Sequence, residues 1–156
     1  MNKERIGMDI KYTHLNIVAK DWRKLAKFYI DVFNCKPKPP ERELSGDWLD
    51  RVTGIDSAHI TGMHLLLPGF EREGPTLEIF QYRESIKNAH RNINKEGFSH
   101  IAFAVDDVER CLAKLKENGG TTVGEVVIGH VENVGTIQVV YGRDPEGNII
   151  EIQRWS

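Results

Sequence analysis

Residues 99–107 read SHIAFAVDD: a hydroxyl residue, a histidine and an alternating apolar run that closes on two aspartates. Residues 13–21 read THLNIVAKD and have the same order 86 positions earlier. Self-similarity at a fixed offset indicates that one structural unit occurs twice in the chain. Alternation of apolar residues with period two predicts that both segments are β-strands.

The same offset continues into the residues that follow each strand. Apolar residues recur there at the i, i+3, i+4, i+7 spacing of one buried helix face: Trp22, Leu25, Ala26 and Tyr29 in the first copy, and Val108, Cys111, Leu112 and Leu115 in the second. Asp21 and Asp107 are placed to cap the two helix N-termini, and Gly119 to end the second helix. Each copy therefore begins strand, then helix.

The two copies also end alike. Residues 74–80 read GPTLEIF and residues 147–153 read GNIIEIQ, now 73 positions apart, so the first copy is 13 residues longer. The extra length lies between Pro37 and Gly69, and we interpret it as a loop insertion with a short helical turn at 47–53. Because loops often carry substrate contacts, residues 48–54 are expected to shape the substrate entrance.

Further strands are predicted at 58–67 and 136–141, each followed by a turn signal. The predicted fold class is α+β, with two paired βαβββ modules that form a half-open barrel around a metal site. We expect one domain over residues 1–156, with modules at about 9–82 and 97–155 and a linker at 83–98.

Four residues capable of binding a metal occupy repeat-equivalent positions, each on the face of its strand opposite the bulky apolar residues: His14, Glu78, His100 and Glu151. If the modules pack around a pseudo-two-fold axis, these side chains can converge on one divalent ion. Imidazole and carboxylate suit first-row metals, and without a metal two adjacent carboxylates would repel each other. The ligand types do not select among Zn, Ni, Co, Mn and Fe.

The other histidines have no repeat-equivalent partner: His59, His64, His90 and His130. We interpret them as incidental, but keep His59 and His64 as pocket candidates because their strand adjoins the insertion. Tyr141 and Arg143, beside the closing turn, are also candidates to line the pocket.

Composition narrows the classes of partner. A net charge of −2 and a pI of 6.3 lack the excess of positive charge expected of a nucleic-acid-binding protein. The longest apolar stretches are only strand-sized, and the polar first residues lack the apolar core of a signal peptide, so no membrane span and a cytoplasmic location are expected. Cys35 and Cys111 are interpreted as structural thiols.

These motifs resemble the vicinal oxygen chelate superfamily, also called the glyoxalase/bleomycin-resistance/extradiol-dioxygenase fold. The resemblance is carried by residues 14–17, 77–79, 99–103 and 144–151 (DPEGNIIE) and covers nearly the whole chain. Within that superfamily the ligand pattern is most similar to those of lactoylglutathione lyases and methylmalonyl-CoA epimerases. Extradiol dioxygenases typically use three ligands, which correspond to His14, His100 and Glu151.

The resemblance implies a metal-dependent lyase or isomerase of the glyoxalase type. Its small substrate would bind the ion through two neighbouring oxygens, and the ion would stabilise an enediolate or enolate. Glu151 is the favoured base, with Glu78 as the alternative. A homodimer is implied, and the site can lie within one chain or between two. Asn16 stands where glyoxalases commonly carry an arginine for glutathione. The competing functions are an Fe(II) extradiol-type dioxygenase and a non-catalytic drug-binding resistance protein.

Overall fold

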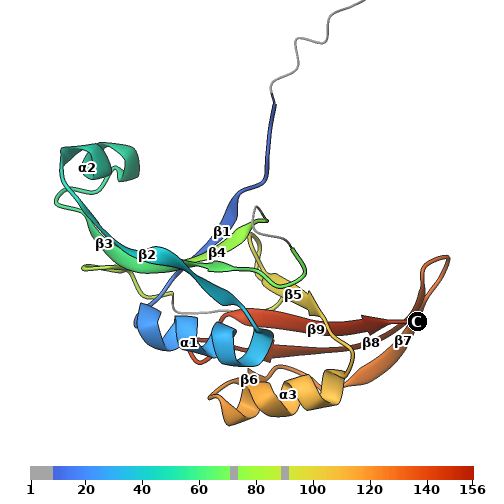
Figure 1. Cartoon of the computed structure of the whole chain (residues 1–156). Helices are drawn as coiled ribbons and strands as arrows, with labels where there is room; N and C mark the ends of the chain where they lie inside the picture. The colour runs from blue at the N-terminus through green and yellow to red at the C-terminus, as the bar shows by residue number, and fades with distance from the viewer. Residues whose placement is uncertain (1–8, 71–73, 89–91) are drawn as a thin grey trace, which may run out of the picture.

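The structure is a computed structural model that describes residues 9–70, 74–88 and 92–156 of the chain (Figure 1). Along the chain its elements are β1 (His14–Val18), α1 (Trp22–Phe33), β2 (Lys36–Ser45), α2 (Asp47–Thr53), β3 (His59–Leu66), β4 (Thr76–Tyr82), β5 (His100–Ala104), α3 (Val108–Glu117), β6 (Thr121–Thr122), β7 (Val127–Val131), β8 (Gly135–Arg143) and β9 (Ile149–Trp155). The α+β class and the internal repeat are confirmed.

Each module builds its own sheet. The first has the order β1-β4-β3-β2, and the second runs β5-β9-β8-β6 with β7 also paired to β8. In both, the opening strand pairs in parallel with the closing strand, β1 with β4 and β5 with β9. The two sheets remain separate within the described ranges and do not close into a barrel.

Helices α1 and α3 cover the same side of the two sheets and lie next to each other (Figure 1). Both predicted N-caps are confirmed, because Asp21 accepts a hydrogen bond from the backbone N–H of Lys24 and Asp107 from that of Arg110. Gly119 follows the second helix with a positive φ of 92°, which glycine adopts at no steric cost. The buried faces of the helices share one core with the sheets, where the rings of Phe33 and Phe103 stack at 4.2 Å.

The predicted loop insertion is partly wrong. Residues 36–45 form β2, a ten-residue strand at the edge of the first sheet, rather than loop. Prolines are tolerated there because an edge strand needs only some of its N–H groups for pairing, and the register breaks between Lys38 and Arg42, across Pro39-Pro40. The helical turn at 47–53 is confirmed as α2, which lies at the far end of the β2–β3 hairpin (Figure 1).

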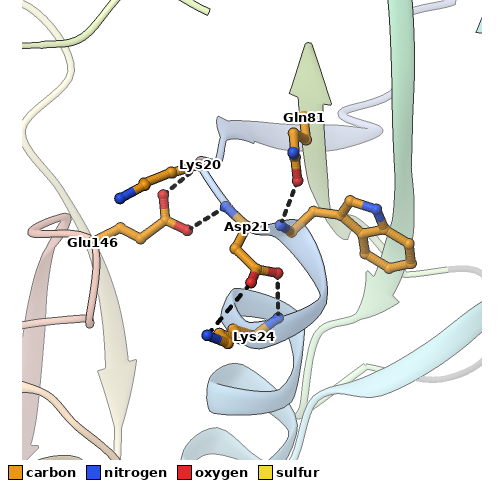
Figure 2. A network of polar contacts seen from close by, with 6 residues as sticks. Lys20, Asp21, Lys24, Gln81 and Glu146 are labelled. Carbon is orange, nitrogen blue, oxygen red and sulfur yellow. Dashed lines mark hydrogen bonds and ion pairs between the residues drawn. The ribbon is translucent and has the colours of Figure 1, made fainter. Parts of the chain in front are cut away.

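Hydrogen bonds between Glu146 of the second module and residues 20–21 of the first join the modules, and we call this contact the clasp. The Glu146 carboxylate, in the turn before β9, accepts hydrogen bonds from the backbone N–H groups of Lys20 and Asp21, and the Gln81 side chain accepts one from Trp22 (Figure 2). The N–H groups of Asp21 and Trp22 lie at the N-terminus of α1, where the helix cannot pair them internally, and these acceptors satisfy them. The turn at residues 144–148 (DPEGN) of the second module therefore holds the N-terminal end of α1 in the first module.

A buried hydrogen bond reinforces this clasp. The Tyr29 hydroxyl donates to Asp144 Oδ2 at 2.9 Å, and the Asp144 carboxylate also accepts from the backbone of Glu146 and from the backbone and side chain of Asn148. Burial raises the pKa of Asp144 above its ordinary value, while these hydrogen bonds oppose the rise.

Candidate metal centre

The first module sets two of the predicted ligands against each other. His14 from β1 and Glu78 from β4 lie on the sheet face away from α1, and His14 Nε2 is 3.5 Å from Glu78 Oε1. Asn16, directly opposite Glu78 in the sheet, donates from its side-chain amide to the same oxygen at 2.8 Å. Glu78 is 9% exposed, which makes it one of the few buried charged residues in the described chain.

A second histidine meets the other oxygen of this carboxylate. His64 lies opposite Glu78 on β3, with its Nε2 2.8 Å from Glu78 Oε2. Its Nδ1 lies 2.8 Å from the hydroxyl of Thr76, which fixes the ring. Burial lowers the pKa of His64, and the Glu78 carboxylate opposes that effect. Nearby Arg42 and Lys38 lower the same pKa, so this imidazole favours its neutral form.

The second module repeats the pair without a second histidine. His100 Nε2 lies 2.9 Å from Glu151 Oε2, and His100 Nδ1 lies 3.2 Å from the Ser99 hydroxyl. Tyr141 occupies the position opposite Glu151 on β8, and its ring meets that of His100 edge-on at 5.2 Å. Burial, and then the Glu151 carboxylate, raise the pKa of Tyr141, so the phenol stays protonated at neutral pH.

The structure brings the four predicted ligands together as two pairs rather than as one set. Among the described residues, one group of three or more His, Cys, Asp or Glu has ligand atoms all within 4.8 Å of one another, and it consists of His14, His64 and Glu78. His100 and Glu151 form their own pair in the other module.

The donor atoms of both pairs suit a divalent ion. Nitrogen and oxygen ligands bind zinc-like ions at about 2.0–2.2 Å, so two neighbouring ligands on one ion are separated by about 3.0–3.4 Å, from octahedral to tetrahedral geometry. The observed separations of 2.8, 2.9 and 3.5 Å lie close to this range. His64 and His100 each have a hydroxyl at Nδ1 and a carboxylate at Nε2, as metal-binding histidines commonly have a polar partner at the second nitrogen.

A cavity of about 740 Å³ lies between the β1 and β5 strands of the two modules. Of the four predicted ligands, His100 lines it, together with small and polar groups that include Asn16 and Ser99. Ala102 and Ala104, which share the face of β5 with His100, are not among the residues that line this cavity.

The inserted segment packs on the same face of the first sheet as the His64 imidazole. Leu49 of α2 belongs to a small apolar cluster with Ile60 and Phe80, and the Phe80 ring lies 6.0 Å from that of His64. Gly62 permits this packing, because a Cβ there would lie 2.7 Å from Phe80 Cδ1 and 2.2 Å from the Ile79 carbonyl oxygen. The expected role of residues 48–54 at the substrate entrance stays a prediction.

The remaining candidates from the sequence are three histidines and Arg143. His59 is an odd number of positions from His64 on β3, and it faces Glu43 at 3.4 Å on the other side of the sheet. His130 lies on β7, away from both pairs, and His90 lies outside the described residues. Arg143 donates to the Gly147 carbonyl within the closing turn.

The thiols fit a structural role. Burial raises the pKa of Cys35 to about 12 and also raises that of Cys111, so neither thiol is activated.

The sequence does not predict that His64 contacts Glu78. The repeat offset does not reveal it, because its counterpart in the second module is Tyr141 and the hairpins of the two modules differ in length. Strand alternation could have shown that His64 shares a face with Gly62 and Ile60, but only the β3–β4 register places it opposite Glu78.

Comparison with known proteins identifies relatives of this arrangement. The chain is 27% identical over 152 residues to a lactoylglutathione lyase of Schizosaccharomyces pombe, with 91% of this chain and 46% of that protein covered. It therefore spans about half the length of this curated relative. None of the helices in the described ranges is long and apolar enough to cross a membrane.

Solved structures show the same fold. A glyoxalase family protein from Bacillus cereus matches with a TM-score of 0.73 and 20% identity over 99% of both chains. A glyoxalase I mutant from Zea mays matches at 0.61 and 23% identity over 92% of this chain and 44% of that one. Glyoxalase I of Leishmania major, described as trypanothione-dependent, matches at 0.62 and 20% identity over 94% and 87%.

A family model covers almost the entire described fold, from residue 11 to residue 152. The repeated modules, the paired histidines and glutamates and this match agree, and the chain belongs to the Glyoxalase/Bleomycin resistance protein/Dioxygenase superfamily.

Proposed function

We propose that this protein is a divalent-metal-dependent lyase or isomerase of the glyoxalase type. The observation that carries the proposal is the repeated pair, His14 with Glu78 and His100 with Glu151, each with an imidazole Nε2 against a carboxylate oxygen. When bound, the ion supplies Lewis-acid stabilisation of the oxyanion that develops on the substrate. Zn, Ni, Co, Mn and Fe all suit these ligands.

The carboxylates would move the proton. One glutamate removes a proton from the carbon beside the substrate carbonyl and returns it to the neighbouring carbon. Glu151 is better suited to this role than Glu78, because among the described residues the one ion pair or hydrogen bond of its carboxylate is with His100. Glu78 is held by Asn16 and faces two imidazoles, so it is less free to leave its position.

The complete centre would form between two copies of the chain. Within one copy the two pairs belong to separate sheets, and the Glu146 clasp fixes how the modules sit. A second copy could bring its His100 and Glu151 to the His14 and Glu78 of the first. The Schizosaccharomyces pombe and Zea mays proteins, of which this chain covers 46% and 44%, are long enough to hold two such units in one chain, which supports the proposal.

The test is metal-dependent exchange of a carbon-bound proton. S-lactoylglutathione, and a lactoyl thioester of a small thiol, are incubated with the protein in deuterated water, and loss of the α-proton signal is followed by NMR. We expect exchange with added divalent metal, none after chelation, and none in Glu151→Gln. Equal exchange with and without metal, or full exchange in Glu151→Gln, would contradict the proposal.

One observation favours a second function. His14, His64 and Glu78 form a two-histidine, one-carboxylate set, the ligand composition typical of non-haem Fe(II) oxygenases. Oxygen consumption with a catechol, restored only by ferrous iron, would support a ring-cleaving dioxygenase in place of the lyase or isomerase.

A further inference from the structure

We propose that His64 is a third protein ligand, and that with His14 and Glu78 it lets the first module hold a divalent metal ion by itself. The inference rests on the proposed function insofar as both place a metal at His14 and Glu78. It goes further in assigning the ion mainly to one module and in adding a ligand from β3.

The geometry of the three side chains carries the proposal. Each oxygen of the Glu78 carboxylate faces a different imidazole, His64 Nε2 at 2.8 Å and His14 Nε2 at 3.5 Å. The two imidazole rings meet edge-on, with centroids 5.5 Å apart. The Nε2 atoms thus converge on one carboxylate from two strands. The three ligand atoms lie within 4.8 Å of one another, close enough to bind one ion together.

The surroundings hold these side chains in place. The side chains of His64 and Glu78 are only 16% and 12% exposed, so their orientations are set by packing. Thr76 fixes the ring of His64 through Nδ1, which leaves Nε2 toward the carboxylate, and Asn16 fixes Glu78. Polar partners of this kind orient metal ligands and typically change metal affinity by about 10- to 100-fold when removed.

The second module offers no equivalent set. Tyr141 stands where His64 stands in the first module, so its donors are the imidazole of His100 and the carboxylate of Glu151, with a phenol beside them. A neutral phenol is a poorer ligand than an imidazole. We call these two residue sets half-sites: His14, His64 and Glu78 in the first module, and His100 and Glu151 in the second. They are related in geometry but unequal in affinity for the ion, so the first should bind the ion before the second contributes.

The first experiment titrates Zn²⁺ into the apoprotein by calorimetry. The variants are His64→Gln, the double variant His100→Gln/Glu151→Gln, the triple combination, and His59→Gln as a control on the opposite face of β3. We expect the double variant to keep measurable affinity, His64→Gln to lose at least about 10-fold, the triple variant to lose binding, and His59→Gln to match wild type.

The outcomes separate this inference from the proposed function. If wild type binds and the double variant does not, while His64→Gln matches wild type, the four-residue centre stands and His64 is not a ligand. If wild type itself binds no metal, both proposals fail. Circular dichroism and thermal melting of each apoprotein check that the variants fold.

A spectroscopic test distinguishes a ligand from a residue that only orients Glu78. His64→Cys loaded with Co²⁺ should show a near-ultraviolet thiolate-to-cobalt charge-transfer band, which wild type and His59→Cys should lack. A folded, Co²⁺-binding His64→Cys protein without that band would overturn the proposal. Should the position-64 variants not fold, X-ray absorption on the Zn²⁺-loaded double variant counts its imidazole ligands: two support the proposal and one overturns it.

Discussion

His64 and Tyr141 occupy equivalent positions in the two modules, each directly opposite the glutamate of its half-site. In the first sheet His64 pairs with Glu78, and in the second Tyr141 pairs with Glu151. Both rings also meet the histidine of the opening strand edge-on, at 5.5 and 5.2 Å. The two half-sites thus share their strand pairing but differ in the side chains beside the glutamate, at His64 and Tyr141 and also where Asn16 faces Glu78 and Ala102 faces Glu151.

This difference predicts that Tyr141→Phe has little effect on metal binding. Burial and the Glu151 carboxylate raise the pKa of Tyr141, so its protonated hydroxyl is not expected to bind the ion. Zn²⁺ calorimetry should give nearly the same affinity for Tyr141→Phe as for wild type, whereas His64→Gln loses affinity. A loss as large as that of His64→Gln would show that the phenol contributes to the centre.

Assembly of the centre between copies predicts complementation. Glu78→Gln and Glu151→Gln each remove one carboxylate from every centre, but a mixed dimer contains one centre with both carboxylates intact. Co-expression of the two variants should restore α-proton exchange to up to about a quarter of the wild-type rate, because half of randomly formed dimers are mixed. Exchange no greater than that of either variant alone would place each centre within one chain.

The buried hydrogen bond from Tyr29 to Asp144 predicts a pH-dependent loss of stability in Tyr29→Phe. Because burial raises the folded-state pKa of Asp144, its contribution to stability is fully present below the unfolded pKa and is lost as pH rises through the folded pKa. Tyr29→Phe removes a hydrogen bond to the ionised Asp144 carboxylate, so it makes that loss of stability larger. Tyr29→Phe should lower the free energy of unfolding by about 1–3 kcal/mol at neutral pH and by less in acid.

Urea unfolding at both pH values measures this effect. Tyr82→Phe serves as a control, because Tyr82 packs in the small cluster beside α2, away from Asp144. An equal loss for Tyr29→Phe at the two pH values would mean that the Asp144 charge is not involved.

The clasp predicts that Glu146→Gln weakens the join between the modules. Its carboxylate accepts from two backbone N–H groups, of Lys20 and Asp21, at the start of α1 (Figure 2). Loss of the negative charge and of one acceptor should reduce the free energy of unfolding by about 1 kcal/mol. Glu132→Gln, in the exposed turn between β7 and β8, should have almost no effect on the same thermal melt, and equal losses would argue against the clasp.

Close packing at Gly62 predicts that Gly62→Ala is strongly destabilising. The added Cβ would lie 2.2 Å from the Ile79 carbonyl oxygen and 2.9 Å from Phe80 Cα, and backbone cannot give way cheaply. We expect a loss of about 1–3 kcal/mol or more in urea unfolding. At Gly129, also in a strand, the nearest atom would be Ile137 Cγ2 at 3.8 Å, so Gly129→Ala should be tolerated.

The sequence by itself determined the opening strand and helix of each module and the faces of those strands. Period-two and period-3.6 patterns are local, so they placed β1, α1, β5 and α3, their capping aspartates, and the sides on which His14 and His100 lie. Repetition added Glu78 and Glu151, because a repeated unit places equivalent residues at equivalent positions.

Only the tertiary structure decided which side chains meet. Hairpin register is set by turn length and by packing over the whole sheet, so the sequence offset could not place His64 opposite Glu78. The prolines of residues 36–45 indicated a loop, yet pairing along an edge made that segment a strand. The arrangement of the four predicted ligands as two pairs likewise depends on how the modules are clasped, through contacts between residues more than 100 positions apart in the chain.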